Sequence, residues 1–338
     1  MLLLNLALLE KIDSQGMHKI YDIWPEIARQ HYETDFTDID FNEITHVVFA
    51  GMGGSGAIGD IFSAILSKTN IHVEVVKGYL LPKTTNSKSL VVTTSVSGNT
   101  EETLNVLDSA FKIKCKIIAF SDGGKMQEFC KNKGLNHIKI SKIHSPRASF
   151  VAYLFSILRI LEPFLPIEKS DIINSLNELE KQRDNISSNN LSEDNPAINL
   201  AESISKIPLI YYPWGLQASA IRFKNSLQEN AKMHAISEDV IEACHNGIVS
   251  WSKSNNIKPI LVRGADDYIK TNERWEILKD YFKKEEIDYR EVFSVSGNIL
   301  VKLINLIYLF DCASVYKAVL IGVNPTPVKA IDFVKKRL

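Results

Sequence analysis

The chain has 338 residues, enough for two domains, because a single hydrophobic core rarely grows beyond about 250–300 residues. Its formal net charge of -1 offers no basic surface for nucleic acid or an acidic membrane, and its 45% hydrophobic residues are ordinary for a globular protein. The four cysteines have no Cys-x-x-Cys spacing, which argues against a zinc site or a disulfide framework and indicates a reducing compartment.

The N-terminal run Met1-Leu-Leu-Leu-Asn-Leu-Ala-Leu-Leu9 is apolar, but it lacks the basic start of a signal peptide and is followed at once by Glu10 and Lys11. The run is also far shorter than the ~20 residues that cross a bilayer as a helix. We therefore expect a cytoplasmic protein with no membrane partner and no nucleic-acid partner.

In the first half of the chain, short apolar runs alternate with helical patterns, which is typical of a parallel sheet with crossover helices. The runs predict strands at residues 46–50, 73–76, 90–94, 115–120 and 137–140. Helices are predicted between and after them, at residues 57–66, 100–111, 125–133 and 149–165.

A helix is predicted over residues 167–183, and the polar, turn-rich stretch 184–196 that follows it is the best domain boundary in the sequence. The second half repeats the α/β rhythm, with strands at 209–212, 260–263 and 289–293 and helices at 217–230, 272–284 and 299–321. We expect an α/β protein with two doubly wound, mainly parallel domains. The N-terminal domain with a helical extension is residues 1–165, the linker 166–200, and the C-terminal domain 201–338.

A glycine-rich loop, Gly51-Met-Gly-Gly-Ser-Gly56, follows a predicted strand and opens a helix. Glycines let backbone N–H groups approach a ligand, and the unpaired donors of a helix start favour an anion. The loop also matches the dinucleotide pattern G-x-G-x-x-G, which needs an acid at the end of the next strand. The only acid nearby, Glu74, lies inside that strand, which weakens a nicotinamide interpretation without excluding it.

A second loop, Ser95-Val-Ser-Gly-Asn-Thr100, also lies between a predicted strand and a helix. A capping box formed by Asn99 and Glu102 is expected there, but it leaves the hydroxyls of Ser95 and Ser97 unexplained. Both loops lie at the carboxyl edge of a parallel sheet, where ligands bind. We expect them to form one site for a phosphate monoester.

The first five residues of this loop recur as Ser294-Val-Ser-Gly-Asn298, after a later strand of the second half. The second copy lacks the Thr-Glu-Glu continuation. It is interpreted as a helix-capping turn, with a functional role left open.

The two loops resemble the sugar isomerase (SIS) domain, and more specifically the bifunctional phosphoglucose/phosphomannose isomerases, which have two such subdomains in tandem. The resemblance extends in the family's order through the following blocks: Ser145-Pro-Arg-Ala148, Leu227-Gln-Glu-Asn-Ala-Lys232, His245-Asn246 before Trp251, and Gly322-Val-Asn-Pro-Thr-Pro-Val-Lys-Ala-Ile-Asp-Phe-Val-Lys335. It implies interconversion of glucose 6-phosphate and mannose 6-phosphate with fructose 6-phosphate through an enediol(ate), with no cofactor and no metal.

The resemblance also implies roles for single residues. Glu229 would be the proton-transfer base, and Arg147 would stabilise the enediolate. His245 would assist ring opening across a homodimer interface, and Lys335, with Lys336 as the register alternative, would be the second ring-opening group.

Substrate-binding residues follow from the same resemblance. Thr326, or Val328 if the alignment shifts, would govern acceptance of the mannose epimer. The phosphate would be held by Gly53, Gly54, Ser55, Ser95, Ser97 and Thr100.

The chain departs from the family pattern at two positions: Gly247 stands where a Glu usually follows the His-Asn pair, and Ser250 replaces the Gly before Trp251. Two other classes of function stay open: a non-catalytic SIS regulator that binds sugar phosphates, and an NAD(P)-dependent oxidoreductase. Within the isomerases, a glucosamine-type or single-sugar enzyme also stays open.

Overall fold

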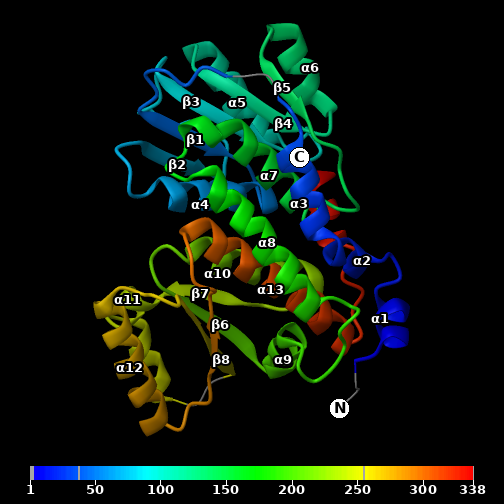
Figure 1. The fold of residues 1–338 in the computed structure, drawn as a ribbon, viewed down its shortest axis with the longest axis vertical. Coiled ribbons are helices and arrows are strands. Elements are labelled where there is room, and N and C mark those ends of the chain that lie inside the picture. Colours follow the sequence, from blue (N-terminus) through cyan, green and yellow to red (C-terminus); the bar gives the residue numbers. More distant parts are fainter. Residues whose placement is uncertain (1–3, 37–38, 254–255, 338) are drawn as a thin grey trace. The chain divides into compact units, whose positions relative to one another are not determined.

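The computed structural model describes residues 4–36, 39–253 and 256–337. These residues form two compact units: Ile23–Leu176, and Met1–Asp22 together with Asn177–Leu338 (Figure 1). The first helices of the chain, α1 (Leu6–Ile12) and α2 (Met17–Asp22), thus belong to the unit built mainly by the second half. The division into domains at residues 1–165 and 201–338 stays a prediction.

The unit Ile23–Leu176 is built on one parallel sheet with the strand order β2-β1-β3-β4-β5. Every residue of the central strands β1 and β3 is buried, as expected when helices cover both faces of a parallel sheet. The parallel α/β architecture predicted from the sequence is confirmed. The strands are β1 (His46–Ala50), β2 (His72–Val76), β3 (Ser89–Thr94), β4 (Lys116–Ser121) and β5 (Asn136–Lys139).

Successive side chains of each strand point to opposite faces of this sheet, and helices cover both faces. On one face, Val48, Val91 and Ala119 form a core with residues of α5 and α6. On the other, Phe49 stacks on Phe62 of α4 with ring centroids 5.1 Å apart. The helices are α3 (Trp24–Glu33), α4 (Gly54–Leu66), α5 (Glu101–Ile113), α6 (Gly124–Lys133), α7 (Phe150–Leu161), the 3₁₀ turn η1 (Glu162–Phe164) and the start of α8 (Lys169–Ile186).

Two differences between the observed and predicted helix limits lie around the expected domain boundary. The helix expected over 149–165 ends at Leu161, because Pro163 lacks the N–H that would continue the α-helical ladder, and a 3₁₀ turn replaces it. Helix α8, expected to end at residue 183, continues to Ile186. The polar stretch after it is an ordered turn: the Ser188 backbone N–H donates to Asp22 at 2.8 Å, and Asn195 caps the next helix.

The second unit also has one parallel sheet, with the strand order β7-β6-β8-β9. Its strands are β6 (Ile207–Tyr212), β7 (Ile236–Asp239), β8 (Ile257–Arg263) and β9 (Arg290–Phe293). Strand β7 was not predicted, because Ile-Ser-Glu-Asp is too short and polar to show a strand pattern. The remaining elements are α9 (Pro196–Ser203), α10 (Gln217–Ser226), η2 (Leu227–Ala231), α11 (Val240–Ala243), η3 (Gly247–Ser252), α12 (Ile269–Lys284), α13 (Ile299–Leu320) and α14 (Lys329–Lys335).

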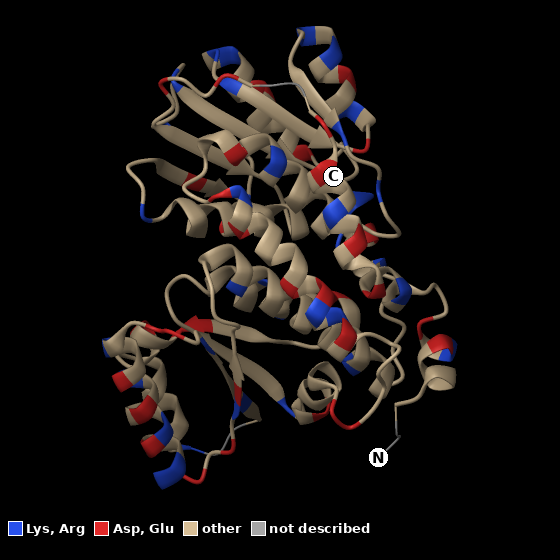
Figure 2. Ribbon diagram, viewed as in Figure 1, with Lys and Arg blue, Asp and Glu red and all other residues tan. Residues whose placement is uncertain are grey.

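Helix α13 is the core helix of this unit. It has 22 residues, and an 18-residue window of it has a mean hydropathy of 1.7, so its length and composition would allow it to cross a membrane, but 89% of that window is buried inside the protein. It packs against α9, α10 and η2. Figure 2 shows that basic and acidic residues are mixed on the outer helices α6 and α12 and are not gathered by sign.

Candidate functional site

The glycine loop after β1 is shaped by close backbone approaches. Gly53 has a positive φ of 54°, and a Cβ on Gly56 would lie 2.7 Å from the carbonyl oxygen of Gly51. One turn later, a Cβ on Gly59 would lie 2.9 Å from Phe49, so this glycine lets α4 pack directly on the sheet. The start of α4 therefore presents backbone rather than side chains around Gly53 and Gly54.

The serine loop after β3 brings two hydroxyls together. Ser95 Oγ and Thr100 Oγ1 are 2.8 Å apart, and Ser95 is buried. Ser97 is exposed, and its Oγ accepts the Asn99 N–H at 3.2 Å. Gly98 has a φ of 66°, and any Cβ there would overlap the Gly123 carbonyl oxygen, 1.8 Å away. Only glycine fits at this position.

The capping box expected from Asn99 and Glu102 is wrong. Helix α5 begins at Glu101 with Thr100 as its N-cap, and no side chain caps it. The Asn99 side chain instead accepts the backbone N–H of Lys125 at 3.0 Å, and the Gly98 carbonyl accepts that of Met126 at 2.9 Å. The serine loop is thus held by hydrogen bonds to the start of α6, and not by a cap of α5, the helix that follows it.

The two loops follow neighbouring strands at the topological switch point of this sheet. Strands β1 and β3 are hydrogen-bonded neighbours, and their connections leave in opposite directions toward β2 and β4. Open α/β sheets bind ligands at such a point. Lys77, which directly follows the neighbouring strand β2, pairs with Asp60 at 2.5 Å. The arrangement offers hydroxyls and helix-start amides to an anion.

The acid that a dinucleotide would need is not at the carboxyl end of β2. Glu74 is the middle residue of the edge strand β2, where it pairs in register with Val48, and its Oε1 accepts the Thr84 hydroxyl at 2.6 Å. Its position therefore gives no support to a ribose-binding role.

Arg147 lies in the turn between β5 and α7, and it is buried, with 4% of its surface exposed. Ser149 organises this turn: its Oγ accepts the Ile143 N–H at 2.8 Å and lies 2.8 Å from the Ser145 carbonyl oxygen. The cation is therefore held in a fixed, desolvated turn rather than on a flexible surface.

Glu229 lies on a π-helical turn, not on the α-helix predicted over 217–230. Helix α10 ends at Ser226, and η2 (Leu227–Ala231) continues it with π geometry until Lys232, whose φ is 55°. Such π turns are rare and occur frequently at functional sites. The Glu229 side chain is half-buried.

A buried polar network holds this π turn against α13. Arg222 Nη2 and Asp311 Oδ2 are 2.6 Å apart, and both residues are buried. Burial lowers the pKa of Arg222, but the Asp311 carboxylate outweighs it, so the pKa lies above its usual value. The network continues through Ser226, which donates to Asp311 at 2.5 Å, and Asn230, which donates to Ser314 at 2.8 Å.

Lys232 joins the Glu229 turn to the segment that carries Thr326. Its ammonium donates to the carbonyl of Glu229 at 2.5 Å and to that of Pro325 at 3.0 Å. The Thr326 backbone N–H in turn donates to Asn324 Oδ1 at 3.0 Å. The structure therefore brings the segments of Glu229 and Thr326 together.

His245 is exposed in the turn after α11. Two residues later, a Cβ on Gly247 would lie 2.8 Å from Glu238 Oε1, so a carboxylate from β7 takes the space beside this glycine. Burial, followed by repulsion from Glu242 and Asp239, raises the pKa of Glu238.

Lys335 is the last residue of α14, and it is exposed together with Phe333 and Val334, whose exposed fractions are 58% and 55%. Lys336 follows as the C-cap and is exposed as well. Within the described part of a single chain, no hydrogen bond or ion pair joins His245 or Lys335 to the Glu229 turn.

The repeated motif 294–298 caps a helix, as expected. Asn298 is the N-cap of α13, and its side chain accepts the Val301 N–H at 2.9 Å. Ser294 Oγ accepts the Ala265 N–H at 3.1 Å. The asparagine of this copy thus caps the helix that follows it, whereas Asn99 of the first copy binds the start of α6.

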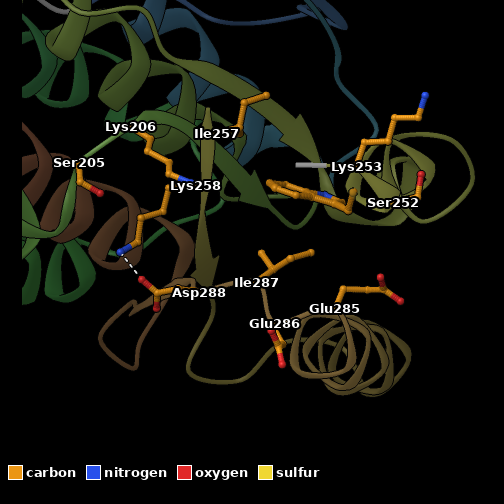
Figure 3. A pocket seen from close by; sticks show the side chains of 11 residues that line it. Ser205, Lys206, Ser252, Lys253, Ile257, Lys258, Glu285, Glu286, Ile287 and Asp288 are labelled. Carbon is orange, nitrogen blue, oxygen red and sulfur yellow. Dashed lines mark hydrogen bonds and ion pairs between the residues drawn. The ribbon is translucent and has the colours of Figure 1, made fainter. Parts of the chain in front are cut away.

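A cavity of about 440 Å³ lies at the amino edge of the second sheet, away from these residues (Figure 3). Its lining includes the segments that lead into β6, β8 and β9, and Lys258 pairs with Asp288 across it at 2.6 Å. Ligands of open α/β sheets bind at the opposite, carboxyl edge. Trp251 alone connects the cavity to the motifs above, so we do not assign the candidate site to it.

Parallel sheets with loops at a switch point define the chain as a doubly wound α/β protein. A family model described as the bacterial phospho-glucose isomerase C-terminal SIS domain matches residues 193–338. A solved hypothetical protein from Thermus thermophilus shares the fold, with a TM-score of 0.73 at 15% identity, covering 98% of this chain and 93% of that chain.

Relatives that match over nearly the full length identify the family. The bifunctional phosphoglucose/phosphomannose isomerase of Caldicellulosiruptor bescii is 32% identical, covering 94% of this chain and 97% of that protein. The protein of the same name from Aquifex aeolicus is 29% identical, covering 96% of each. This chain belongs to the bifunctional phosphoglucose/phosphomannose isomerase family, which confirms the resemblance noted from its motifs.

Proposed function

We propose that this protein is an aldose–ketose isomerase that interconverts glucose 6-phosphate and mannose 6-phosphate with fructose 6-phosphate. The observation that carries the proposal is the full-length match to relatives bearing that name, at 32% identity over 94% of the chain. The loop geometry at the β1/β3 switch point supports it, because a phosphate monoester is the ligand that these hydroxyls and amides suit.

The phosphate is held at the two loops of the first sheet. Ser95 and Thr100 present paired hydroxyls, and Ser97 and Ser55 add two more at the loop surfaces. The backbone N–H groups at Gly53 and Gly54, at the start of α4, complete the anion site. Neutral donors hold the phosphate, so the anchoring needs no metal and no cofactor.

Glu229 transfers the proton between C1 and C2. A base must remove a proton from one carbon and return it to the neighbouring one, and a half-buried carboxylate on a fixed turn suits this task. The buried Arg147 supplies the positive charge that stabilises the enediolate oxygen.

His245 and Lys335 open the sugar ring, with His245 contributed from the second subunit of a homodimer. Both side chains are exposed in a single chain, as expected of groups that complete a site on assembly. Apolar surface near them supports an interface: Val249 is 70% exposed and Phe333 58%.

Thr326, next to the Glu229 turn, governs acceptance of the mannose epimer. A cytoplasmic location fits the four free cysteines.

The decisive experiment is a coupled assay of the purified protein with glucose 6-phosphate and mannose 6-phosphate in parallel. Wild-type protein should form fructose 6-phosphate from both, and Glu229→Gln should lower kcat by ~100–10,000-fold, the usual contribution of a general base. Fructose 6-phosphate should still raise the Tm of the variant, because binding to the folded state stabilises it.

Other outcomes separate the alternatives. A protein that is stabilised by fructose 6-phosphate but forms no product from either aldose would be a sugar-phosphate sensor. Stabilisation by NAD(P) and not by the sugar phosphate would indicate an oxidoreductase. Either result would overturn the isomerase proposal.

A further inference from the structure

Three metal-ligating side chains converge at the amino end of the first sheet, and the isomerase mechanism uses none of them. They are His46 at the start of β1, and His72 and Glu74 on β2. One ligand atom from each lies within 4.8 Å of the others. His46 Nε2 is 3.5 Å and His72 Nε2 is 3.3 Å from the same carboxylate oxygen, Oε1 of Glu74.

The sheet itself brings this cluster together. His46 on β1 pairs in register with His72 on β2, so the two side chains stand on the same face of the sheet. Glu74 lies two residues after His72, and the period of 2 returns it to that face. The cluster therefore rests on strand pairing and not on a flexible loop.

One nitrogen of the cluster is buried and faces the Glu74 carboxylate without a well-formed hydrogen bond. His46 is 7% exposed, and its Nε2 has no hydrogen bond among the described residues. Its neighbour Glu74 Oε1 is 3.5 Å away, too far for a strong hydrogen bond, and an ion bound between the two atoms is one explanation of this spacing. The other ring nitrogen, Nδ1, lies 3.0 Å from Ser89 Oγ on the neighbouring strand β3.

Ser89 can set the tautomer of the His46 ring. Its hydroxyl oxygen already accepts the Asn86 N–H at 3.0 Å and has a second lone pair for His46 Nδ1–H. With the proton on Nδ1, the lone pair of Nε2 points toward Glu74. This arrangement, in which the far nitrogen donates to a neighbouring group, is typical of histidines that bind metals. Glu74 is oriented in the same way by the Thr84 hydroxyl, at 2.6 Å.

We propose that His46 Nε2, His72 Nε2 and a carboxylate oxygen of Glu74 form a divalent metal site suited to Zn²⁺. Zinc is bound by His nitrogen and carboxylate oxygen at about 2.0–2.2 Å in tetrahedral geometry, which separates neighbouring ligand atoms by roughly 3.3–3.5 Å. The two separations from the Glu74 oxygen, 3.3 and 3.5 Å, match that edge, and the two histidine nitrogens lie within 4.8 Å of each other. A solvent molecule is the fourth ligand, since His72 is 62% exposed on its side chain.

The site is a structural clip. It links the edge strand β2 to the central strand β1 at their amino ends, whereas the phosphate loops follow the carboxyl ends of β1 and β3. The proposal is therefore independent of the isomerase reaction. Its effect is to stabilise this unit against loss of its edge strand.

The test is metal binding by the full chain, with any affinity tag removed and the protein first stripped with a chelator. After equilibrium dialysis against Zn²⁺, the wild type should retain about one ion per chain and show a higher Tm. His72→Gln and Glu74→Gln should each weaken binding at least ~10-fold and abolish the Tm shift; both change exposed or half-buried side chains, so the fold should survive.

The matched control is His234→Gln, which removes an exposed histidine outside the cluster and should bind Zn²⁺ like the wild type. Co²⁺ should give the intense visible absorption of tetrahedral coordination in the wild type and in this control, but not in His72→Gln. The proposal is overturned if the wild type retains well under one ion per chain, or if His72→Gln retains as much as the control.

Discussion

Serine residues of the repeated motif allow a matched comparison at the scale of single side chains. Ser97 follows β3 in the proposed phosphate site, and Ser296 occupies the same place in the second copy, before α13. Both are exposed, so neither replacement by alanine should affect packing. Comparing the two variants therefore distinguishes an effect on phosphate binding from a general effect of changing the motif.

Ser97→Ala should raise KM for glucose 6-phosphate about 10-fold with little change in kcat, because a hydrogen bond to a charged group contributes ~1.5 kcal/mol or more. Ser296→Ala should leave both constants unchanged. Steady-state assays of the two variants check this. If the two variants change KM equally, or if neither changes it, Ser97 does not bind the phosphate.

Glu238 and Gly247 form the other informative pair of residues. The family pattern has a Glu at position 247, and the Glu238 carboxylate lies where such a side chain would begin. Burial raises the pKa of Glu238 above 4.5, which means that the charged form is disfavoured in the folded state. A raised carboxyl pKa costs stability above that folded pKa and costs nothing below the unfolded one.

Glu238→Gln should therefore raise the free energy of unfolding slightly near pH 7, and the gain should vanish as the pH falls below about 4.5, the unfolded pKa. Urea denaturation of the wild type and the variant across this pH range measures it. A gain that is constant with pH would mean that the charge is not the cause.

At the scale of elements, the contact between α10, η2 and α13 depends on one buried ion pair. Asp311→Ala leaves Arg222 as an uncompensated buried charge and should lower the free energy of unfolding by ~3–5 kcal/mol. The matched control is Asp108→Ala, which breaks the exposed pair Asp108–Lys112 on α5 and should cost less than ~1 kcal/mol. Comparable losses for the two variants in denaturant unfolding would contradict this.

The same elements show why helix prediction failed at Glu229. Apolar and polar residues continue from Gln217 to Asn230 without a Gly or Pro, so an uninterrupted α-helix was expected. Hydrogen bonds from Ser226 and Asn230 to Asp311 and Ser314 of α13 hold the π turn in place, and no pattern within residues 217–230 encodes them. An acid in the middle of the apolar run 299–321 was the available signal that α13 carries a buried partner.

At the scale of the whole molecule, the proposed donation of His245 across a homodimer can be tested by mixing two inactive variants. Glu229→Gln and His245→Ala should each be inactive alone. After co-refolding in equal amounts, half of the dimers are mixed, and each holds one site with both wild-type groups, so about a quarter of wild-type activity should return.

No activity should return if each site takes both residues from one chain. Size-exclusion chromatography with light scattering provides the control, because it shows whether dimers form and exchange. Activity well below a quarter in fully exchanged dimers would contradict donation of His245.

From the sequence alone, the alternating pattern determined the parallel α/β class, and the glycine and serine loops predicted an anion site at the edge of a sheet. These features are local: a buried strand is apolar along its length, and a loop that approaches a ligand needs glycine. The ordered motifs also sufficed for the family, which the full-length relatives confirm.

Only the tertiary structure decided the rest. It showed that Asn99 binds the start of α6 and forms no capping box. It also showed that the Glu229 turn is a π-helix and that Glu238 lies beside Gly247. It also brought His46 to His72 and Glu74, although the spacing of the cysteines gave no hint of a metal. Each of these contacts joins residues from different elements, and no pattern within one stretch of sequence encodes which strand or helix becomes the neighbour.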